Sequence, residues 1–211
     1  MSSDAKAANA IPEQQILDSA YQLLLAHGPL RLTMADLARR SGVSRTTLYR
    51  RWGSVDEVLA ALLVRACARV VEEALPDEGR GARSTARLVD GIVGLVRGFR
   101  RDPLLRSIIE IDPDYLTPYL VRERSASADY QLATLEAALD HGMAAGVVRR
   151  ADPQLLARSV LLVIRSFILT GQVFVGAADL DDPEMDRLDA ELRRMITAYL
   201  APPALDAWAA A

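Results

Sequence analysis

The amino-acid sequence predicts an all-α protein, with a small N-terminal head of three helices followed by a larger C-terminal helical domain. Three observations predict this fold class. Apolar residues recur at helical spacing almost throughout from Pro12 onward. No segment shows the sustained alternation of apolar and polar residues that is typical of a strand. Four Asp-Pro steps divide the second half of the chain, and Asp as N-cap before Pro marks a helix start.

The composition excludes several classes of protein. The 211 residues are 51% hydrophobic and 25% charged, which excludes a wholly disordered or collagen-like chain. Cys67 is the single cysteine, so the fold needs no oxidising compartment and we expect a cytoplasmic protein. The first ten residues lack the apolar stretch of a signal peptide. We interpret residues 1–11 as a flexible arm.

Local start and stop signals define the helices of the head. The first helix ends at His27, where Gly28 and Pro29 follow. Thr33, with Asp36 three residues later, has the pattern of an N-cap and opens a short helix to about Ser41.

A tight turn and two further helices come next. Ser44 is the expected cap of a second short helix that runs to about Trp52. Ser54 and Glu57 form a capping box for a longer helix to about Leu75, and Pro76 ends it.

Residues 33–52 meet the physical requirements of a helix-turn-helix. Ala38 is small where two short helices must cross, and Gly42 suits the positive φ of the turn. An apolar seam between the helices and a polar outer set are both present. The seam is Leu37, Val43 and Leu48, and the outer set is Arg45, Thr46, Thr47, Tyr49, Arg50 and Arg51. Guanidinium, hydroxyl and phenol groups are the donors needed to bind phosphates and base edges.

The charge distribution supports a polyanion-binding head. The chain has a net charge of −3, and its cations are 24 arginines and Lys6. Between Gly28 and Gly53 six arginines face Asp36 alone, a net charge of +5 that leaves −8 on the remaining chain. A compact basic block in an acidic protein is typical of a nucleic-acid-binding module. A solvated, arginine-rich helix face is the alternative interpretation.

The Asp-Pro steps and a loop at residues 77–84 divide the rest of the chain. We expect domains at 12–75 and 76–211. The expected helices of the second domain are 84–101, 103–110, 114–146 (with a possible break near Pro118), 153–175 and 183–200.

The segment 153–175 is apolar on most faces. A membrane span is disfavoured because Arg158, Arg165 and Gln172 lie within it, and a central arginine costs about 2.5–3.5 kcal/mol on insertion scales. We expect burial in a core or between subunits, and no membrane partner. A buried arginine needs a partner, so we expect Arg165 to pair with an acidic residue of another helix, with an anionic ligand as the alternative.

The residues of the head resemble the tetracycline-repressor (TetR) family of transcriptional regulators. The resemblance covers about residues 12–70, with "LTMADLARRSGVSRTTLYRRW" and "SVDEVLAALL" as its most specific parts. It implies that Arg45 and Thr47 approach bases, and that Thr33 and Tyr49 bond phosphates. The full expected DNA-binding set is Thr33, Ser44, Arg45, Thr46, Thr47, Tyr49, Arg50 and Arg51. Trp52 is expected in the core rather than at a contact.

One residue departs from the family pattern. Family members commonly have a phosphate-binding lysine at the first position of the helix after the motif, where this chain has Val55. Ser54 or backbone N–H groups at that helix start are possible substitutes.

The resemblance also implies a homodimer, paired through 153–175 and 183–200, that binds a palindromic double-stranded DNA operator. It implies a pocket for a small-molecule effector in the C-terminal domain. The candidate ligand-binding residues are Phe99, Tyr115, Tyr119, Arg165 and Phe174. Gly91, Gly94 and Gly98 permit either close helix packing, which we favour, or cavity volume.

Neither a metal site, a cofactor nor an enzymatic activity is expected. Cys67, His27 and His141 are scattered along the chain, and no phosphate-binding glycine loop or nucleophile elbow is present in the sequence. We therefore expect a ligand-responsive transcriptional repressor. The alternative is a helical ligand-binding or interaction protein with little specific DNA affinity.

Overall fold

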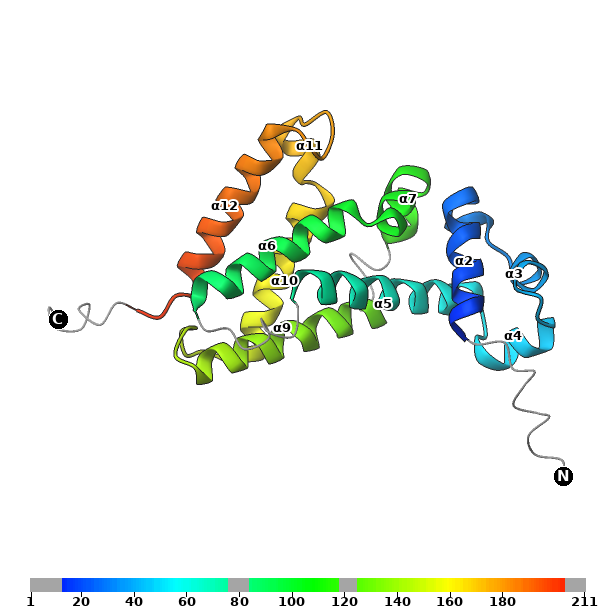
Figure 1. Ribbon diagram of the computed structural model, residues 1–211, viewed down its shortest axis with the longest axis horizontal. Helices are drawn as coiled ribbons and strands as arrows, with labels where there is room; N and C mark the ends of the chain where they lie inside the picture. Colours follow the sequence, from blue (N-terminus) through cyan, green and yellow to red (C-terminus); the bar gives the residue numbers. More distant parts are fainter. Residues whose placement is uncertain (1–12, 76–83, 118–124, 204–211) are drawn as a thin grey trace, which may run out of the picture. The chain divides into compact units, whose positions relative to one another are not determined.

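A computed structural model describes residues 13–75, 84–117 and 125–203 (Figure 1). Within these ranges the chain is helical and contains no strand, which confirms the all-α class. The predicted arm at 1–11, the break near Pro118 and the candidate residue Tyr119 lie outside the described residues. The chain forms two compact units, one of residues 1–66 and 103–127, the other of 67–102 and 128–211. The predicted domains at 12–75 and 76–211 stay a prediction.

The first unit is built from short helices around one apolar core (Figure 1, blue to cyan for its first three helices). Its helices are α2 (Glu13–His27), α3 (Met34–Ser41), α4 (Arg45–Arg51), the start of α5 (Val55–Ala74) and α7 (Pro103–Ile111). Short 3-10 helices lie between α2 and α3 at Pro29–Arg31 and after α7 at Pro113–Leu116. Leu104 and Ile108 of α7 are buried in the same core as the helix-turn-helix.

Gly28 follows the end of α2, and two features of this position favour glycine. Its φ of +77° lies in the region that favours glycine. A Cβ at this position would also lie 2.6 Å from Asp112 Oδ2 and 2.7 Å from Ile111 Cγ2, closer than atoms can pack. The stop signal predicted from the sequence is therefore also a point of close approach within the first unit.

The second unit packs its helices around a separate core. They are α6 (Thr85–Arg101), α9 (Ala126–Ala144), α10 (Pro153–Leu169), α11 (Gly171–Val175) and α12 (Pro183–Leu200), with the last part of α5. Helices α6, α10 and α12 are mutual neighbours (Figure 1). The most buried side chains of this core include Val89, Val96, Leu139, Val160 and Leu192.

The Asp-Pro steps before α10 and α12 begin these helices by the predicted mechanism. Asp152 and Asp182 each accept a hydrogen bond from a backbone N–H two residues on, at 2.9 Å in both cases. The N–H groups of Glu184 and Ala178 lower the pKa of Asp182, because they stabilise its charged form. Asp112 makes no such cap, and its Oδ2 lies 3.4 Å from the N–H of Leu30.

Two predicted helices are shorter than expected. The segment 114–146 is not one helix, since its start belongs to a 3-10 turn and α9 begins at Ala126. The segment 153–175 breaks at Thr170, whose φ of −120° and ψ of −10° separate α10 from α11. The next residue, Gly171, lies against Leu188 of α12, where a Cβ would be 2.8 Å from Leu188 Cδ2. Tertiary packing therefore accompanies a break that the apolar pattern did not reveal.

The glycines of α6 serve close packing against α5. A Cβ at Gly91 would overlap Leu75 Cδ2, and one at Gly98 would lie 2.7 Å from Val70 Cγ1. At Gly94 it would touch the Cβ of Ala74 at 3.5 Å. The favoured interpretation is confirmed, because these positions face a neighbouring helix rather than a cavity.

Among the described helices, none is both long enough and apolar enough to cross a membrane.

Candidate nucleic-acid interface and ligand cavity

The helix-turn-helix is held together by local backbone bonds. The Thr33 Oγ1 accepts the N–H of Asp36 at 3.1 Å and caps α3. Gly42 takes a φ of +72° at the end of α3 and donates its N–H to Ala38. The Ser44 Oγ accepts the N–H of Thr47 at 3.1 Å and caps α4. Each residue predicted to start or end these helices does so.

The seam between the two short helices is apolar as predicted. Leu37, Ala38 and Leu48 are buried, and Val43 is partly buried against them. Trp52 is buried in the same core, so its expected structural role is confirmed. The buried seam fixes the face that α4 leaves outside.

The structure places all eight predicted DNA-binding residues on the surface of the first unit. Tyr49 is 55% exposed, so among the described residues it is not part of the buried core. The remaining seven are also exposed: Thr33, Ser44, Arg45, Thr46, Thr47, Arg50 and Arg51. Thr33 and Ser44 additionally cap α3 and α4, and Ser44 Oγ lies 2.9 Å from Thr47 Oγ1.

The arginines of this surface differ in their partners. Arg39 pairs with Asp36, whose pKa is lowered first by the Thr33 hydroxyl and then by Arg39. Arg51 lies 3.9 Å from Glu13 Oε2 and over the ring of Trp52. Arg45 and Arg50 form no ion pair with any described residue, so their guanidinium groups are available to an external anion.

The start of α5 has the predicted capping box, and it carries Val55 where family members commonly have a lysine. The N–H of Glu57 donates to Ser54 Oγ at 3.2 Å, and its carboxylate accepts the N–H of Gly53 at 2.7 Å. Val55 is partly buried against the first core. It therefore packs where a lysine would extend outward.

An almost wholly apolar cavity of about 20 Å³ lies in the second unit, between α5, α6, α9 and α10. Its lining is Val71, Leu95, Phe99, Gln131, Thr134, Leu135, Leu161, Ile164 and Ile168. This volume holds about one water molecule. An organic ligand therefore requires the lining side chains to shift.

The structure does not bring the predicted ligand-binding residues together. Phe99 lines the cavity, and Arg165 lies beside it. Tyr115 belongs to the first unit, where its hydroxyl donates to Asp56 Oδ1 at 3.3 Å. Phe174 is 85% exposed on α11. Sequence reasoning missed Gln131, whose polar type in a mixed helix gave no signal.

The expected ion pair of Arg165 is absent among the described residues. Its Nη2 donates instead to the Gln131 amide oxygen at 3.3 Å. Burial lowers the pKa of Arg165, because it disfavours the charged form. The acidic partner expected from the sequence is replaced by a neutral amide.

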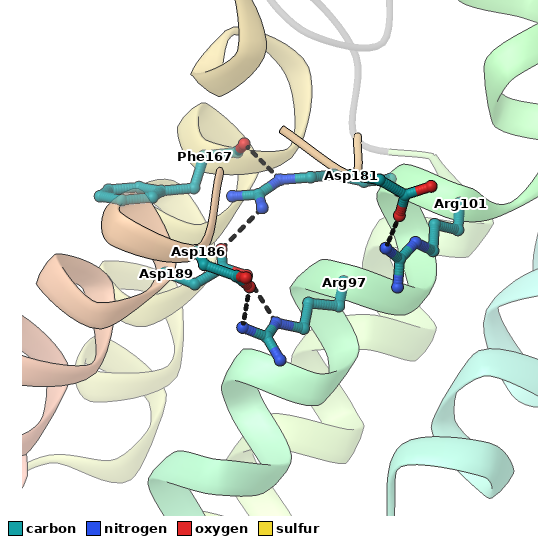
Figure 2. Close-up of polar contacts among 7 residues, drawn as sticks. Arg97, Arg101, Phe167, Asp181, Asp186 and Asp189 are labelled. Carbon is teal, nitrogen blue, oxygen red and sulfur yellow. Dashed lines mark hydrogen bonds and ion pairs between the residues drawn. The ribbon is translucent and has the colours of Figure 1, made fainter. Parts of the chain in front are cut away.

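The buried ion pair of this unit involves Arg100 instead. Asp189 of α12 accepts from Arg100 Nη1 and Arg97 Nε, both at 2.6 Å, and Arg97 Nη2 donates to Asp186 at 2.9 Å (Figure 2). Arg100 Nε also donates to the carbonyl of Phe167. The two arginines lie three residues apart on α6, and the two aspartates lie three residues apart on α12. This matching spacing is a signal in the sequence that could have indicated the pairing.

A capped helix-turn-helix with exposed arginines on its second helix defines a DNA-binding regulatory protein. The comparisons agree with this class. A model of the tetR family of bacterial regulatory proteins matches residues 16–62. An uncharacterized HTH-type transcriptional regulator of Mycobacterium tuberculosis is 31% identical over 188 residues, which cover 88% of this chain and 93% of the relative. The chain belongs to the tetR family, whose members are transcriptional regulators and not enzymes.

Solved structures share the fold over nearly the whole chain. The repressor QsdR of R. erythropolis, 21% identical, has a TM-score of 0.65 and covers 88% of this chain and 93% of its own. SmeT, the repressor of a Stenotrophomonas maltophilia multidrug efflux pump, is 23% identical with a TM-score of 0.58 and covers 93% of both chains. SmeT has also been solved in complex with triclosan, with a TM-score of 0.53, 22% identity and coverage of 90% and 92%.

Proposed function

We propose that this regulator is a cytoplasmic repressor that binds a palindromic operator as a homodimer and is released by a small-molecule ligand. The observation that carries the proposal is the outer face of α4. It presents Arg45 and Arg50 without an ion-pair partner among the described residues, beside exposed Thr46 and Tyr49. Residues 12–75 act in this proposal as the DNA-binding domain and 76–211 as the sensing and dimerisation domain.

Each exposed side chain of α4 has a defined role in the proposal. Arg45 and Thr47 at the start of α4 read bases, with Thr46 and Arg50 beside them. Thr33, Ser44, Tyr49 and Arg51 bond the phosphates. A guanidinium fork suits the O6 and N7 acceptors of guanine, and hydroxyl groups suit phosphate oxygens.

Replacing Arg45 with alanine is expected to weaken operator binding by about 5- to 150-fold and to relax sequence preference, because one bidentate base contact contributes about 1–3 kcal/mol. A gel shift over a salt series, on the DNA upstream of the protein's own gene, measures this. Wild-type binding should fall steeply with salt.

Arg106→Ala is the matched control, since Arg106 is an exposed arginine of the same unit that pairs with Glu110 on α7. Wild-type binding that never exceeds the level seen with unrelated DNA contradicts the repressor. It favours the alternative, a helical ligand-binding or interaction protein with little specific DNA affinity.

Exposed apolar side chains on α10, α11 and α12 support the homodimer. Leu155 and Leu162 lie seven residues apart on one face of α10, and Leu162 is 72% exposed. Met195 and Tyr199 lie one turn apart on α12. The inner faces of both helices are already used for the core of the second unit. Large apolar side chains that one chain leaves exposed are typical of an interface.

We expect Leu162→Glu to shift the protein from dimer to monomer at micromolar concentration, because the charge would be buried between two copies. Sedimentation equilibrium measures the mass. Leu30→Glu, a similarly exposed leucine of the first unit, should leave the mass unchanged. A wild-type protein that sediments as a monomer contradicts the interface.

The apolar cavity supports the proposed small-molecule ligand binding. SmeT, with which this chain shares its fold, has been solved with triclosan, and we propose a small, largely apolar effector for the cavity around Phe99. Because side chains of four helices line the cavity, a ligand that widens it must shift side chains of these helices.

A further inference from the structure

The polar side chains at the apolar cavity gather at one point of its lining. The Gln131 side chain is held from both ends, since its Nε2 donates to Cys67 Sγ at 3.2 Å and its Oε1 accepts from Arg165 Nη2 at 3.3 Å. Thr134 is the other polar side chain of the lining, and its hydroxyl donates to the backbone carbonyl of Tyr130. A ligand in the cavity therefore meets polar groups chiefly at Gln131.

Arg165 lies at the edge of the same cavity by helical register. Leu161, Ile164 and Ile168 of α10 line the cavity. Arg165 is one turn beyond Leu161 and next to Ile164, so it shares the side of the helix that faces the cavity. Its partial burial and its bond to Gln131 agree with this position.

Arg165 is partly buried, but its hydrogen-bond acceptor, the Gln131 amide, is a weak partner for a guanidinium. Among the described residues no carboxylate lies within ion-pair distance of it, whereas the buried Arg100 of the same unit has Asp189. A neutral amide oxygen brings no opposite charge to the guanidinium, whereas a carboxylate does and can accept two of its N–H groups. Burial disfavours the guanidinium cation, and its hydrogen-bond acceptor among the described residues is a neutral amide. An incoming anion would offset it better.

We propose that the cavity takes an amphiphilic monoanion, an aliphatic chain that ends in a carboxylate. The carboxylate accepts two hydrogen bonds from Arg165 and displaces the Gln131 amide, and the chain extends among Leu95, Leu161 and Ile168. The occupant is aliphatic because leucine, isoleucine and valine dominate the lining. This inference rests on the proposed function and specifies the chemical class of its effector.

Three probes of equal chain length test the headgroup: decanoate, 1-decanol and decylamine, each titrated calorimetrically into the full-length protein at pH 7.5 without DNA. Decanoate is expected to bind at least about tenfold more tightly than 1-decanol, because it gains charge-assisted bonds, and decylamine is expected to bind most weakly. Arg165→Gln should bring decanoate to within about threefold of 1-decanol. Arg158→Gln removes the same charge from an exposed position on α10 and should keep the wild-type preference.

A second variant tests the same inference without removing the arginine. Gln131→Glu supplies Arg165 with a carboxylate from the protein, so we expect a higher melting temperature and loss of the preference for decanoate. Wild-type protein that binds decanoate no more tightly than 1-decanol, or that binds no probe, overturns the inference. So does an Arg165→Gln variant that keeps the preference.

These outcomes are separate from those of the operator gel shift. If decanoate binds with the expected preference but the protein has no specific DNA affinity, the ligand class stands and the repressor function fails. If the operator binds and decanoate does not, the repressor function stands and the ligand class fails.

Discussion

Replacing Asp189 with alanine is expected to lower the free energy of unfolding by about 3–5 kcal/mol, the loss typical of breaking a buried ion pair by removing one partner. Asp189 and Arg100 are both buried, and the carboxylate also accepts from Arg97. Its removal leaves the Arg100 cation in the interior with the Phe167 carbonyl as its one remaining acceptor in the part of the chain that the structure describes. Urea denaturation followed by circular dichroism at 222 nm measures the loss.

Asp186→Ala is the matched control for this prediction. Asp186 lies one turn before Asp189 on α12 and bonds the same Arg97, but its side chain is 81% exposed. An exposed ion pair contributes about 0–1 kcal/mol, so the control should remain close to wild type. The double variant Arg100→Met, Asp189→Leu should recover most of the loss, because it removes both charges together. Equal losses for the two single aspartate variants would contradict a buried pair.

Leu48→Ala is expected to destabilise the first unit by about 2–5 kcal/mol and to abolish operator binding with it. Leu48 is fully buried between the helix-turn-helix and the rest of the head, so its truncation leaves a cavity at the base of α4. Trp52 is buried in the same core and reports on its unfolding. Urea titrations followed by tryptophan fluorescence in a Trp208→Phe background measure the change, since Trp208 is the other tryptophan of the chain.

Tyr49→Ala separates stability from binding on the same helix. Tyr49 follows Leu48 directly and is exposed, so its truncation should change stability by less than about 0.5 kcal/mol. Operator affinity should nevertheless fall, because a phosphate contact is lost. A Tyr49 variant that loses as much stability as the Leu48 variant would show that the outer face of α4 is packed rather than free.

The sequence predicted the head well because local interactions determine its elements. Thr33 and Ser44 bond N–H groups three residues away, and Gly42 adopts the φ that the turn requires. Interactions between residues this close in the sequence lie wholly within the motif, so the motif alone is enough to predict them. The exposed set on α4 followed from the buried seam, since a helix that buries Leu48 must turn its other residues outward.

Features that depend on distant segments could not be predicted in the same way. The partner of Arg100 is 89 residues away in the sequence, and that of Arg165 is 34 residues away. A single helix pattern shows that an arginine is buried but does not show which side chain another helix places against it. The break at Thr170 similarly involves Leu188 of α12. The cavity needs four helices, and the apolar pattern of each is that of ordinary core.

The contribution of α7 to the core of the first unit affects how the protein is made. Leu104 and Ile108 complete a core whose other helices end near Leu62, and residues 67–102 of the other unit lie between them in the chain. At about 5–20 residues per second, a ribosome needs a few seconds to proceed from Leu62 to Ile108. Until α7 has been made, the apolar core of the head lacks the side chains of Leu104 and Ile108. The nascent head therefore depends on later synthesis, and a chaperone has a brief window in which to bind it.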